Sequence, residues 1–483
     1  MQFNSFEYIL FFLPVVVLLY WIFRTSIINK YLIFLASCIF YGWVHPWFLI
    51  PMFASAFMDY FIAQKIYDSK DERKRLLLLW TSIGFSLMLM SFFKYTQWIT
   101  QSLVSLGPIL GTTIVAAPIR VILPPGVSFY TFETISYTID VYRRDFEPRR
   151  KLLDYLSFIV FFPHLVAGPI RRAKDLLPVL ASFRPPIDWA AASQAVFYIT
   201  WGIFLKVTFA DNCGAIVESI TTTMGRDGKL EAGFGLIFSY AFAFQIYCDF
   251  SAYSLIARGS ALLFGIDVQR NFLTPYFASN PSDFWQRWHI SLSTWLRDYL
   301  YVPLGGNQRG TLITLRNLLI VMTLGGLWHG AGIMFIFWGL WHGLLLVFYR
   351  LCPFDEWLVR WLGWFGRAVA VLIFFHLVCF GWILFRSSLQ DFPMIMRSIA
   401  GVPHILRFRA GMAPTLPWLT WWLLLFTAPV TLADFAGYLR RCEFADLWHG
   451  MPIPVRAILL VAIFYGIVFF GARQANEFIY FAF

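Results

Sequence analysis

The chain has 483 residues, of which 59% are hydrophobic and 13% are charged, and its formal net charge is +11. Soluble domains carry about 25% charged residues, so this composition excludes a soluble protein and predicts one embedded in a lipid bilayer. The basic residues occur in short runs beside apolar stretches, which is the positive-inside pattern of membrane proteins and argues against a nucleic-acid-binding face.

Apolar stretches long enough to cross a bilayer recur along the chain, since a transmembrane helix needs about 20 mostly apolar residues. They fall near residues 7–23, 29–44, 47–66, 76–96, 155–170, 195–220, 233–265, 311–350, 367–386, 416–436 and 455–472. We predict about eleven crossings, some of them re-entrant. Because no internal repeat or low-complexity linker interrupts the chain, we expect one membrane domain over 1–483, with N-terminal spans in 1–120, a core in 121–390 and C-terminal spans in 391–483.

The distribution of cations predicts how the chain is oriented. The cluster after the third apolar stretch marks that loop as cytoplasmic, and consists of Lys65, Lys70, Arg73, Lys74 and Arg75. The loop that holds Arg24 and Lys30 is then also cytoplasmic, and the N-terminus lies outside. Arg24 follows the first apolar run rather than preceding it, so we expect residues 7–23 to remain as a span rather than act as a cleaved signal peptide.

Several classes of site find no support in the sequence. The six cysteines show no CxxC pairing, so we interpret them as core residues and expect neither a disulfide framework nor a metal site. No nucleophile elbow, Walker loop or HExxH motif occurs, which argues against a serine hydrolase, a nucleotide-driven pump and a zinc protease.

The middle of the chain differs in amino-acid composition from both ends. Between residues 124 and 350 the apolar runs are broken by Gly, Pro, His, Asn and charged residues, and such groups are tolerated at membrane depth only where protein or a water-filled cavity satisfies them. Within this region the segment from Asp283 to Asn307 mixes aromatic residues with charged ones. We predict that it forms an amphipathic helix that lies at the interface or lines a cavity.

Histidine is the natural base for a hydroxyl group at working pH, and the chain has eight histidines. His329 lies in LGGLWHGAG, where glycines permit close backbone approach and leave room for a substrate beside the imidazole. An equally weighted alternative is a tight helix crossing with small-residue contacts. His342, in a second Trp-His-Gly, falls on another face if one helix spans both histidines, and is the weaker candidate.

Two further polar groups interrupt long apolar tracts. Asp249 lies in QIYCDFSAYS, and Asp211 lies in FADNC. A buried carboxylate needs a partner, for which we expect Arg258 or Arg270, and a structural ion pair is as plausible as a catalytic role.

Taken together, these motifs resemble the membrane-bound O-acyltransferase family, in the bacterial branch of alginate O-acetyltransferases. The resemblance covers nearly the whole chain and is most specific in YCDFSAYSLIARGSALLFGI, NFLTPYFASNPSDFWQRWHISLSTWLRDYLYVPLGGN and LGGLWHGAG. It implies an all-α polytopic membrane protein, a helical bundle of about eleven transmembrane helices with re-entrant or interfacial helices around a central tunnel.

The resemblance also implies roles for particular residues. His329 matches the histidine that the family treats as catalytic, and His289 matches an upstream polar position. His376 looks like a further histidine of the same branch, and Arg297 and Asp298 are supporting residues within the matched segment. His329 would act as base on an acceptor hydroxyl while an acyl thioester approaches from the cytoplasm, and His289 would position or polarise a reacting group.

The ending FIYFAF resembles a motif whose tyrosine, here Tyr480, accepts the acyl group and passes it to an extracytoplasmic transferase. A phenol with a pKa of about 10 is a poor nucleophile until a base takes its proton, so Tyr480 must reach a histidine such as His329. The alternative is that Phe478, Tyr480 and their neighbours form an interfacial aromatic anchor. Basic residues before the last span would place Tyr480 on the outer side.

The function that the resemblance implies is acetyl transfer across a bacterial inner membrane. Acetyl-CoA would be the donor, with no tightly bound cofactor and no metal. The acceptor would be an alginate-like exopolysaccharide, cellulose or peptidoglycan, reached through a periplasmic SGNH-type acetyltransferase. Basic stretches at 143–151 and 171–174 could meet the phosphates of the donor, although positive-inside topology explains them equally well.

Two alternatives remain open on the sequence. One is D-alanyl transfer to teichoic acid, which is less favoured because this chain carries its own FIYF ending and extra C-terminal spans. The other is a transporter or flippase without acyl chemistry, which an inverted repeat or paired broken helices would favour, and neither is present in the sequence.

Overall fold

The computed structural model describes residues 1–107, 111–112, 121–166, 168–182, 186–403, 415–472 and 478–479. Within these ranges the chain is built from helices and turns, without a β-strand, so the predicted all-α fold class is confirmed. The chain forms two compact units, one of Met1–Ala195 with Ala257–Gln269, the other of Val196–Ile256 with Arg270–Phe483. The single domain expected from the sequence, with divisions near residues 120 and 390, stays a prediction.

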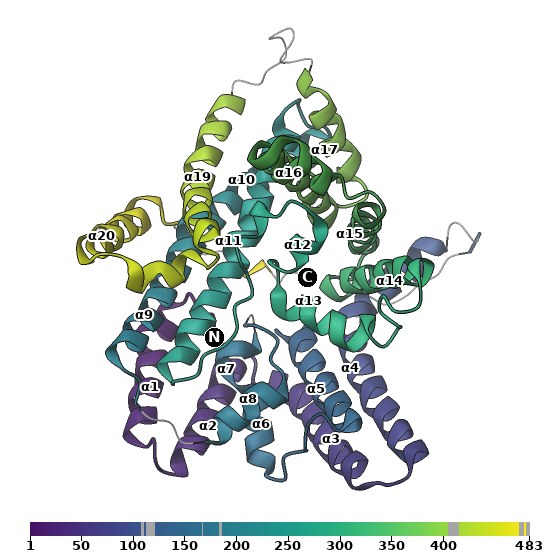
Figure 1. Cartoon of the computed structure of the whole chain (residues 1–483), viewed down its shortest axis with the longest axis vertical. Coiled ribbons are helices and arrows are strands. Elements are labelled where there is room, and N and C mark those ends of the chain that lie inside the picture. The colour runs from purple at the N-terminus through teal and green to yellow at the C-terminus, as the bar shows by residue number, and fades with distance from the viewer. Residues whose placement is uncertain are drawn as a thin grey trace. The chain divides into compact units, whose positions relative to one another are not determined.

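The first unit contains the N-terminal helices. Its elements are η1 (Glu7–Phe12), α1 (Leu13–Ile22), α2 (Ile28–Gly42), η2 (Pro46–Phe48), α3 (Leu49–Asp68), α4 (Glu72–Leu106), α5 (Val127–Arg143), α6 (Leu152–Val160), α7 (Phe162–Leu165) and α8 (Ala173–Ala181). Helices α3, α4 and α5 pack against one another, and α2 packs against α6 (Figure 1).

The apolar stretch at 155–170 is not the continuous span that we expected. It divides into α6 and the single turn α7, because the backbone leaves the helical conformation at Phe161 and Pro163 begins a new turn. Both pieces are buried, so their apolar composition reflects the core of this unit rather than contact with lipid.

The second unit contains the polar, glycine-rich middle of the chain and its C-terminal helices. Helix α9 (Trp189–Phe204) leads into it, followed by η3 (Leu205–Ala210), α10 (Asp211–Asp227), α11 (Phe234–Leu263), η4 (Pro275–Phe277), α12 (Pro281–Trp285), α13 (Ile290–Leu296), η5 (Arg297–Tyr301), α14 (Thr311–His329), α15 (Ile333–Leu351), α16 (Phe354–Arg386), α17 (Asp391–Ala400), α19 (Leu416–Arg440), η6 (Phe444–Gly450) and α20 (Ile453–Phe470).

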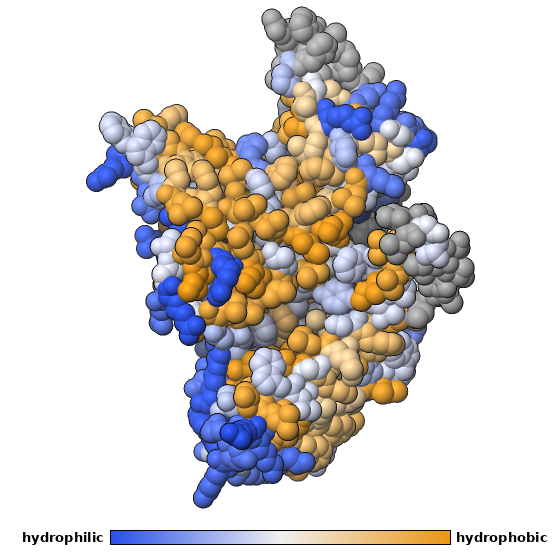
Figure 2. Space-filling view, turned by 90° about the vertical axis from the view of Figure 1, so that its right-hand side faces the viewer, coloured by the Kyte–Doolittle hydropathy of each residue, from blue (hydrophilic) through white to orange (hydrophobic). Residues whose placement is uncertain are grey.

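The surface and the helix lengths fit a membrane protein. Eight helical segments in the described part of the chain are long and apolar enough to cross a bilayer, and two further apolar helical segments, Glu7–Ile22 and Ile28–Gly42, are shorter. Apolar side chains cover much of the face shown in Figure 2. On a different face, α20 exposes large apolar residues such as Ile458 and Phe469. The number of crossings, about eleven by the sequence, stays a prediction.

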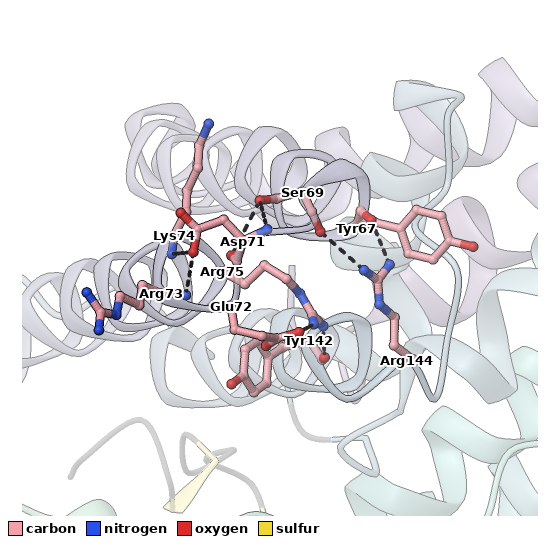
Figure 3. Close-up of polar contacts among 9 residues, drawn as sticks. All are labelled: Tyr67, Ser69, Asp71, Glu72, Arg73, Lys74, Arg75, Tyr142 and Arg144. Atoms are coloured by element: carbon pink, nitrogen blue, oxygen red, sulfur yellow. Dashed lines mark hydrogen bonds and ion pairs between the residues drawn. The ribbon is translucent and has the colours of Figure 1, made fainter.

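The basic loop that predicts the orientation joins α3 to α4 (Figure 3). Asp71 caps α4 by accepting the backbone N–H groups of Arg73 (2.9 Å) and Lys74 (3.4 Å), whose side chains are exposed. Arg75 differs, because it is buried and its guanidinium donates to Glu72 and to the carbonyl oxygen of Tyr142. The exposed cations of this loop are therefore the ones available to hold it on one side of a membrane.

The cysteines follow the core interpretation only in part. Cys213, Cys248 and Cys379 are buried, and Cys38 and Cys442 are half-buried. The interpretation is wrong for Cys352, which is exposed just after the end of α15.

Candidate active site

Two antiparallel helices, α14 and α15, carry the histidine that the sequence singles out. His329 is the last residue of α14, and α15 begins at Ile333. A Cβ on Gly326 would lie 2.2 Å from the carbonyl oxygen of Phe335, and a Cβ on Gly339 would lie 2.3 Å from that of Met322. These glycines therefore allow the two helix backbones to touch, as small residues do between membrane helices.

The glycine beside His329 does not leave room for a substrate, contrary to our expectation. A Cβ on Gly330 would lie 2.1 Å from the ring of Phe335, which fills that space. The alternative interpretation, a close helix crossing, is therefore the one that describes the glycines of this motif.

His329 itself lies in an aromatic enclosure and is only 3% exposed. Its ring centroid is 4.9 Å from Trp328, 4.9 Å from Trp338 and 5.5 Å from Phe385. The ring of His289 is 6.3 Å away. The structure thus brings together the two histidines that the family resemblance implies, among packed aromatic rings.

His289 lies at a break in the segment that we expected to be one amphipathic helix. The segment forms α12, α13 and η5, because His289 adopts a left-handed conformation (φ 42°) between the first two. A non-glycine residue rarely takes this conformation, and such strain gathers at functional sites. His289 is fully buried, packs 4.6 Å from the ring of Phe250, and its burial lowers its pKa to about 3. Its imidazole is therefore neutral at working pH.

The buried side chain of Asn271 holds the backbone around His289. Its carbonyl oxygen accepts from the hydroxyl of Ser291 (2.7 Å), and its amide donates to Ser254 of α11 (3.1 Å). The backbone N–H of Ile290 donates to the backbone carbonyl of Asn271 (2.9 Å). These bonds on the C-terminal side of His289 offset the cost of its left-handed conformation.

His342 belongs to the same enclosure, although the sequence ranked it lower. The expectation of separated faces rested on one continuous helix, and the turn after His329 makes two. The ring of Trp338 packs 4.9 Å from His329 on one side and 4.9 Å from His342 on the other. The two Trp-His-Gly motifs were the signal for this arrangement, once a glycine-containing turn between them is recognised.

Other predicted site residues lie outside the histidine enclosure. His376 is exposed on α16, where one ring nitrogen is 2.9 Å from the hydroxyl of Tyr240 and the other is 2.7 Å from the carbonyl oxygen of Leu372. Arg297 forms an ion pair with its neighbour Asp298 (2.7 Å). Tyr480 lies outside the described residues.

A cavity of about 820 Å³ opens beside the histidine enclosure, within the second unit. Its walls come from α12, α13, η5, α14, α15 and the start of α16, and include Trp285, Thr294, Arg297 and Arg350. The segment 283–301 therefore lines a cavity, which is one of the two roles that we expected for it. Trp285 packs 5.9 Å from Trp338 and 5.2 Å from His342, so ring contacts connect the cavity wall to the enclosure.

The buried carboxylates of Asp211 and Asp249 share one ammonium group. The Nζ of Lys206 lies 2.8 Å from Asp211 and 2.9 Å from Asp249, and all three side chains are buried. We expected Arg258 or Arg270 as the partner of Asp249, but Lys206 takes that place, and Arg270 pairs with Asp446 at 3.4 Å. Lys206 lies in the π-helical segment η3, a type of irregularity frequent at functional sites.

Phe478 and Ile479, near the C-terminus, are buried in the interior of this unit. The backbone N–H of Ile479 donates to Asp249 (2.7 Å), and the ring of Phe478 stacks on Tyr253 at 4.2 Å. Phe478 also packs 5.9 Å from Phe250, which in turn contacts His289. Because Phe478 is fully buried, it is not part of an interfacial anchor. Sequence reasoning missed these contacts because they join residues far apart in the chain, 230 positions for Ile479 and Asp249.

Comparison with known proteins identifies the family to which this chain belongs. The profile of the membrane-bound O-acyltransferase family matches residues 148–385. A probable alginate O-acetylase of Pseudomonas putida is 37% identical over 392 residues, which cover 80% of this chain and 78% of that protein. The chain belongs to the membrane-bound O-acyltransferase family.

Two other relatives show the breadth of the family. A peptidoglycan O-acetyltransferase of Helicobacter pylori is 32% identical over 432 residues, covering 83% of this chain and 80% of that protein. A teichoic acid D-alanyltransferase of Bacillus subtilis is 28% identical over 278 residues, covering 54% and 68%. As a membrane-bound O-acyltransferase the chain is an enzyme, and the matched residues include His289, His329 and His342.

Proposed function

We propose that this enzyme takes an acetyl group from cytoplasmic acetyl-CoA and delivers it, through Tyr480, for O-acetylation of a polysaccharide outside the inner membrane. The observation that carries the proposal is the convergence of the buried histidines with the C-terminal segment. Ile479, the neighbour of Tyr480 in the chain, is bonded to Asp249, and Phe478 reaches Phe250, which packs on His289.

The first half-reaction forms an ester on the phenol. His329 takes the proton of the Tyr480 hydroxyl while the phenolic oxygen attacks the thioester carbonyl carbon, and the carbon–sulfur bond then breaks. The proton held by His329 passes to the departing thiolate, which leaves as the free thiol of CoA. Loss of this proton regenerates His329 as the neutral base for the next turnover.

His289 serves the same step as a neutral group. A neutral imidazole carries one N–H donor, and a donor aimed at the carbonyl oxygen stabilises the negative charge that develops there. The left-handed backbone at His289 and the hydrogen bonds of Asn271 fix the direction of the ring in advance. Such preorganisation is what makes a single donor effective in a dry site.

The cavity beside the enclosure is the proposed entry for the donor. Its wall holds Arg297 and Arg350 as well as the carboxylates of Asp283, Asp355 and Glu356, and we assign the phosphate contacts to the two arginines. Its volume of about 820 Å³ is in the usual range for small-molecule sites. The basic stretch at 143–151 does not line this cavity and belongs to the first unit.

The proposed polysaccharide acceptor is taken from the substrates of the relatives. Two relatives that cover about 80% of this chain are a probable alginate O-acetylase and a peptidoglycan O-acetyltransferase. We therefore place the enzyme in a bacterial inner membrane, with the N-terminus outside, and assign completion of the transfer to a periplasmic SGNH-type acetyltransferase. D-alanyl transfer is the second candidate, and it is weaker because that relative covers only 54% of the chain.

The test is mass spectrometry of the C-terminal peptide after incubation of the purified enzyme with isotope-labelled acetyl-CoA. We expect a labelled acetyl group on Tyr480 in the wild type and in His376→Ala, and none in His329→Ala. Label on none of the three proteins would exclude the tyrosine relay or the donor, and D-alanyl thioester is then the next donor to supply. Label on His329→Ala at the wild-type rate would exclude His329 as the base.

A further inference from the structure

The C-terminal segment is hydrogen-bonded to the rest of the second unit on both sides of residues 473–477. Before that stretch, the backbone N–H of Ala472 donates to the carbonyl oxygen of Val207 (2.9 Å), and the amide of Asn212 donates to the carbonyl oxygen of Phe470 (2.7 Å). After it, the N–H of Ile479 donates to Asp249, whose other carboxylate oxygen faces Lys206. Every one of these bonds uses the backbone of the tail.

The charges explain why the bond to Ile479 is a strong one. Two carboxylates, Asp211 and Asp249, face the single ammonium of Lys206, and all three are at most 3% exposed. One oxygen of Asp249 is occupied by Lys206, so its second oxygen requires an N–H donor, which the tail provides at 2.7 Å. Withdrawal of the tail would leave that buried charge without its donor, an arrangement that proteins avoid.

We propose that Lys206 and Asp249 form a clasp that positions the C-terminal tail, holding it by the backbone N–H of Ile479 so that Tyr480 is presented to the histidine enclosure. Asp249 is then a positioning residue and takes no part in the chemistry. Two contacts with α11 fix the tail in position. The ring of Phe478 stacks on Tyr253, and the backbone N–H of Ile479 donates to Asp249. The functional part of this inference rests on the proposed relay through Tyr480.

The first measurement is hydrogen–deuterium exchange of the peptide that covers residues 478–483, in the full-length protein, and it does not depend on any acyl chemistry. Asp249→Asn removes the charge that holds the N–H, and still leaves Lys206 paired with Asp211. We expect exchange in this peptide to become at least tenfold faster in Asp249→Asn. Asp434→Asn, which removes a carboxylate of α19 that accepts from Tyr247 (3.0 Å), is the matched control and should exchange like the wild type. Unchanged exchange in a folded Asp249→Asn protein would overturn the clasp.

The second measurement uses the tail itself, where a substitution leaves the buried charges in place. Ile479→Pro lacks the N–H donor, whereas Ile479→Val keeps it. We expect formation of acetyl-Tyr480 to fall at least tenfold in Ile479→Pro and to stay near the wild-type rate in Ile479→Val, with an unchanged KM for acetyl-CoA in both. Equal rates in the two variants would overturn the positioning role. If no protein forms acetyl-Tyr480 while Asp249→Asn still speeds exchange of the tail peptide, the relay through Tyr480 is excluded and the clasp is supported.

Discussion

The ring centroids of His289 and His329 lie 6.3 Å apart, and the indole ring of Trp328 packs against both imidazoles. One histidine ends a long helix and the other lies at a strained turn between two short ones. The pair therefore offers two imidazoles from different elements, which suits a base and a hydrogen-bond donor that act on one acyl group.

Removal of the proposed base should abolish most of the transfer without harm to the fold. We expect His329→Ala to lower the rate of acetyl transfer about 10²–10⁴-fold, the usual contribution of general base catalysis. His376→Ala, on the exposed face of α16, should keep the wild-type rate, because that ring contacts Tyr240 and Leu372 and not the enclosure. Initial rates with labelled acetyl-CoA measure both, and a comparable loss in the two variants would contradict the assignment.

Acidification should destabilise the protein through His289. Its pKa is about 3 in the folded protein and 6.5 in the unfolded chain. Between these values the unfolded state binds a proton that the folded state does not, so stability falls as the pH drops below 6.5. From pH 7 to pH 5 the loss is on the order of 2 kcal/mol for this group.

Thermal melting in detergent at pH 7 and pH 5 tests this effect. The drop in Tm should be smaller in His289→Gln, whose side chain stays neutral at both pH values, than in the wild type. His376→Gln, at an exposed position, is the control and should show the wild-type drop. An identical drop in all three proteins would mean that His289 does not carry the pH dependence.

A methyl group at Gly330 should disturb the enclosure. In Gly330→Ala the new Cβ meets the ring of Phe335, which packs 5.0 Å from Phe385 beside His329. Overpacking of this kind costs about 1–3 kcal/mol, so we expect a lower Tm and slower transfer. Gly84→Ala on α4 is the matched control, since nothing lies within 4 Å of its Cβ. Recovery of activity in Gly330→Ala with Phe335→Leu would trace the defect to this contact.

The cations of the cavity wall should act on donor binding and not on chemistry. We expect Arg297→Gln and Arg350→Gln each to raise the KM for acetyl-CoA about tenfold, with little change in kcat, because a lost phosphate contact costs roughly 1–2 kcal/mol. Arg226→Gln, which lies outside the cavity and pairs with Asp227, should leave both constants unchanged. An effect on kcat alone would assign these arginines to another step.

Local properties of the sequence were sufficient for several predictions. The membrane class and the helical fold follow from apolar run lengths, because a lipid environment leaves helices as the simplest way to satisfy every backbone group. The glycine-flanked His329 and the mixed polar and aromatic segment around His289 stood out against apolar surroundings. Those signals depend on neighbours in the chain and require no knowledge of packing.

Tertiary structure decided the features that depend on distant partners. Asp249 is satisfied by Lys206 and by the amide of Ile479 rather than by the arginines nearest in sequence, since desolvated charges select partners by geometry. His342 joins His329 because a turn folds α15 back along α14, and the amphipathic segment breaks because the left-handed conformation at His289 interrupts it. Composition and periodicity determine which residues enter the membrane, and long-range packing alone determines which polar groups meet there.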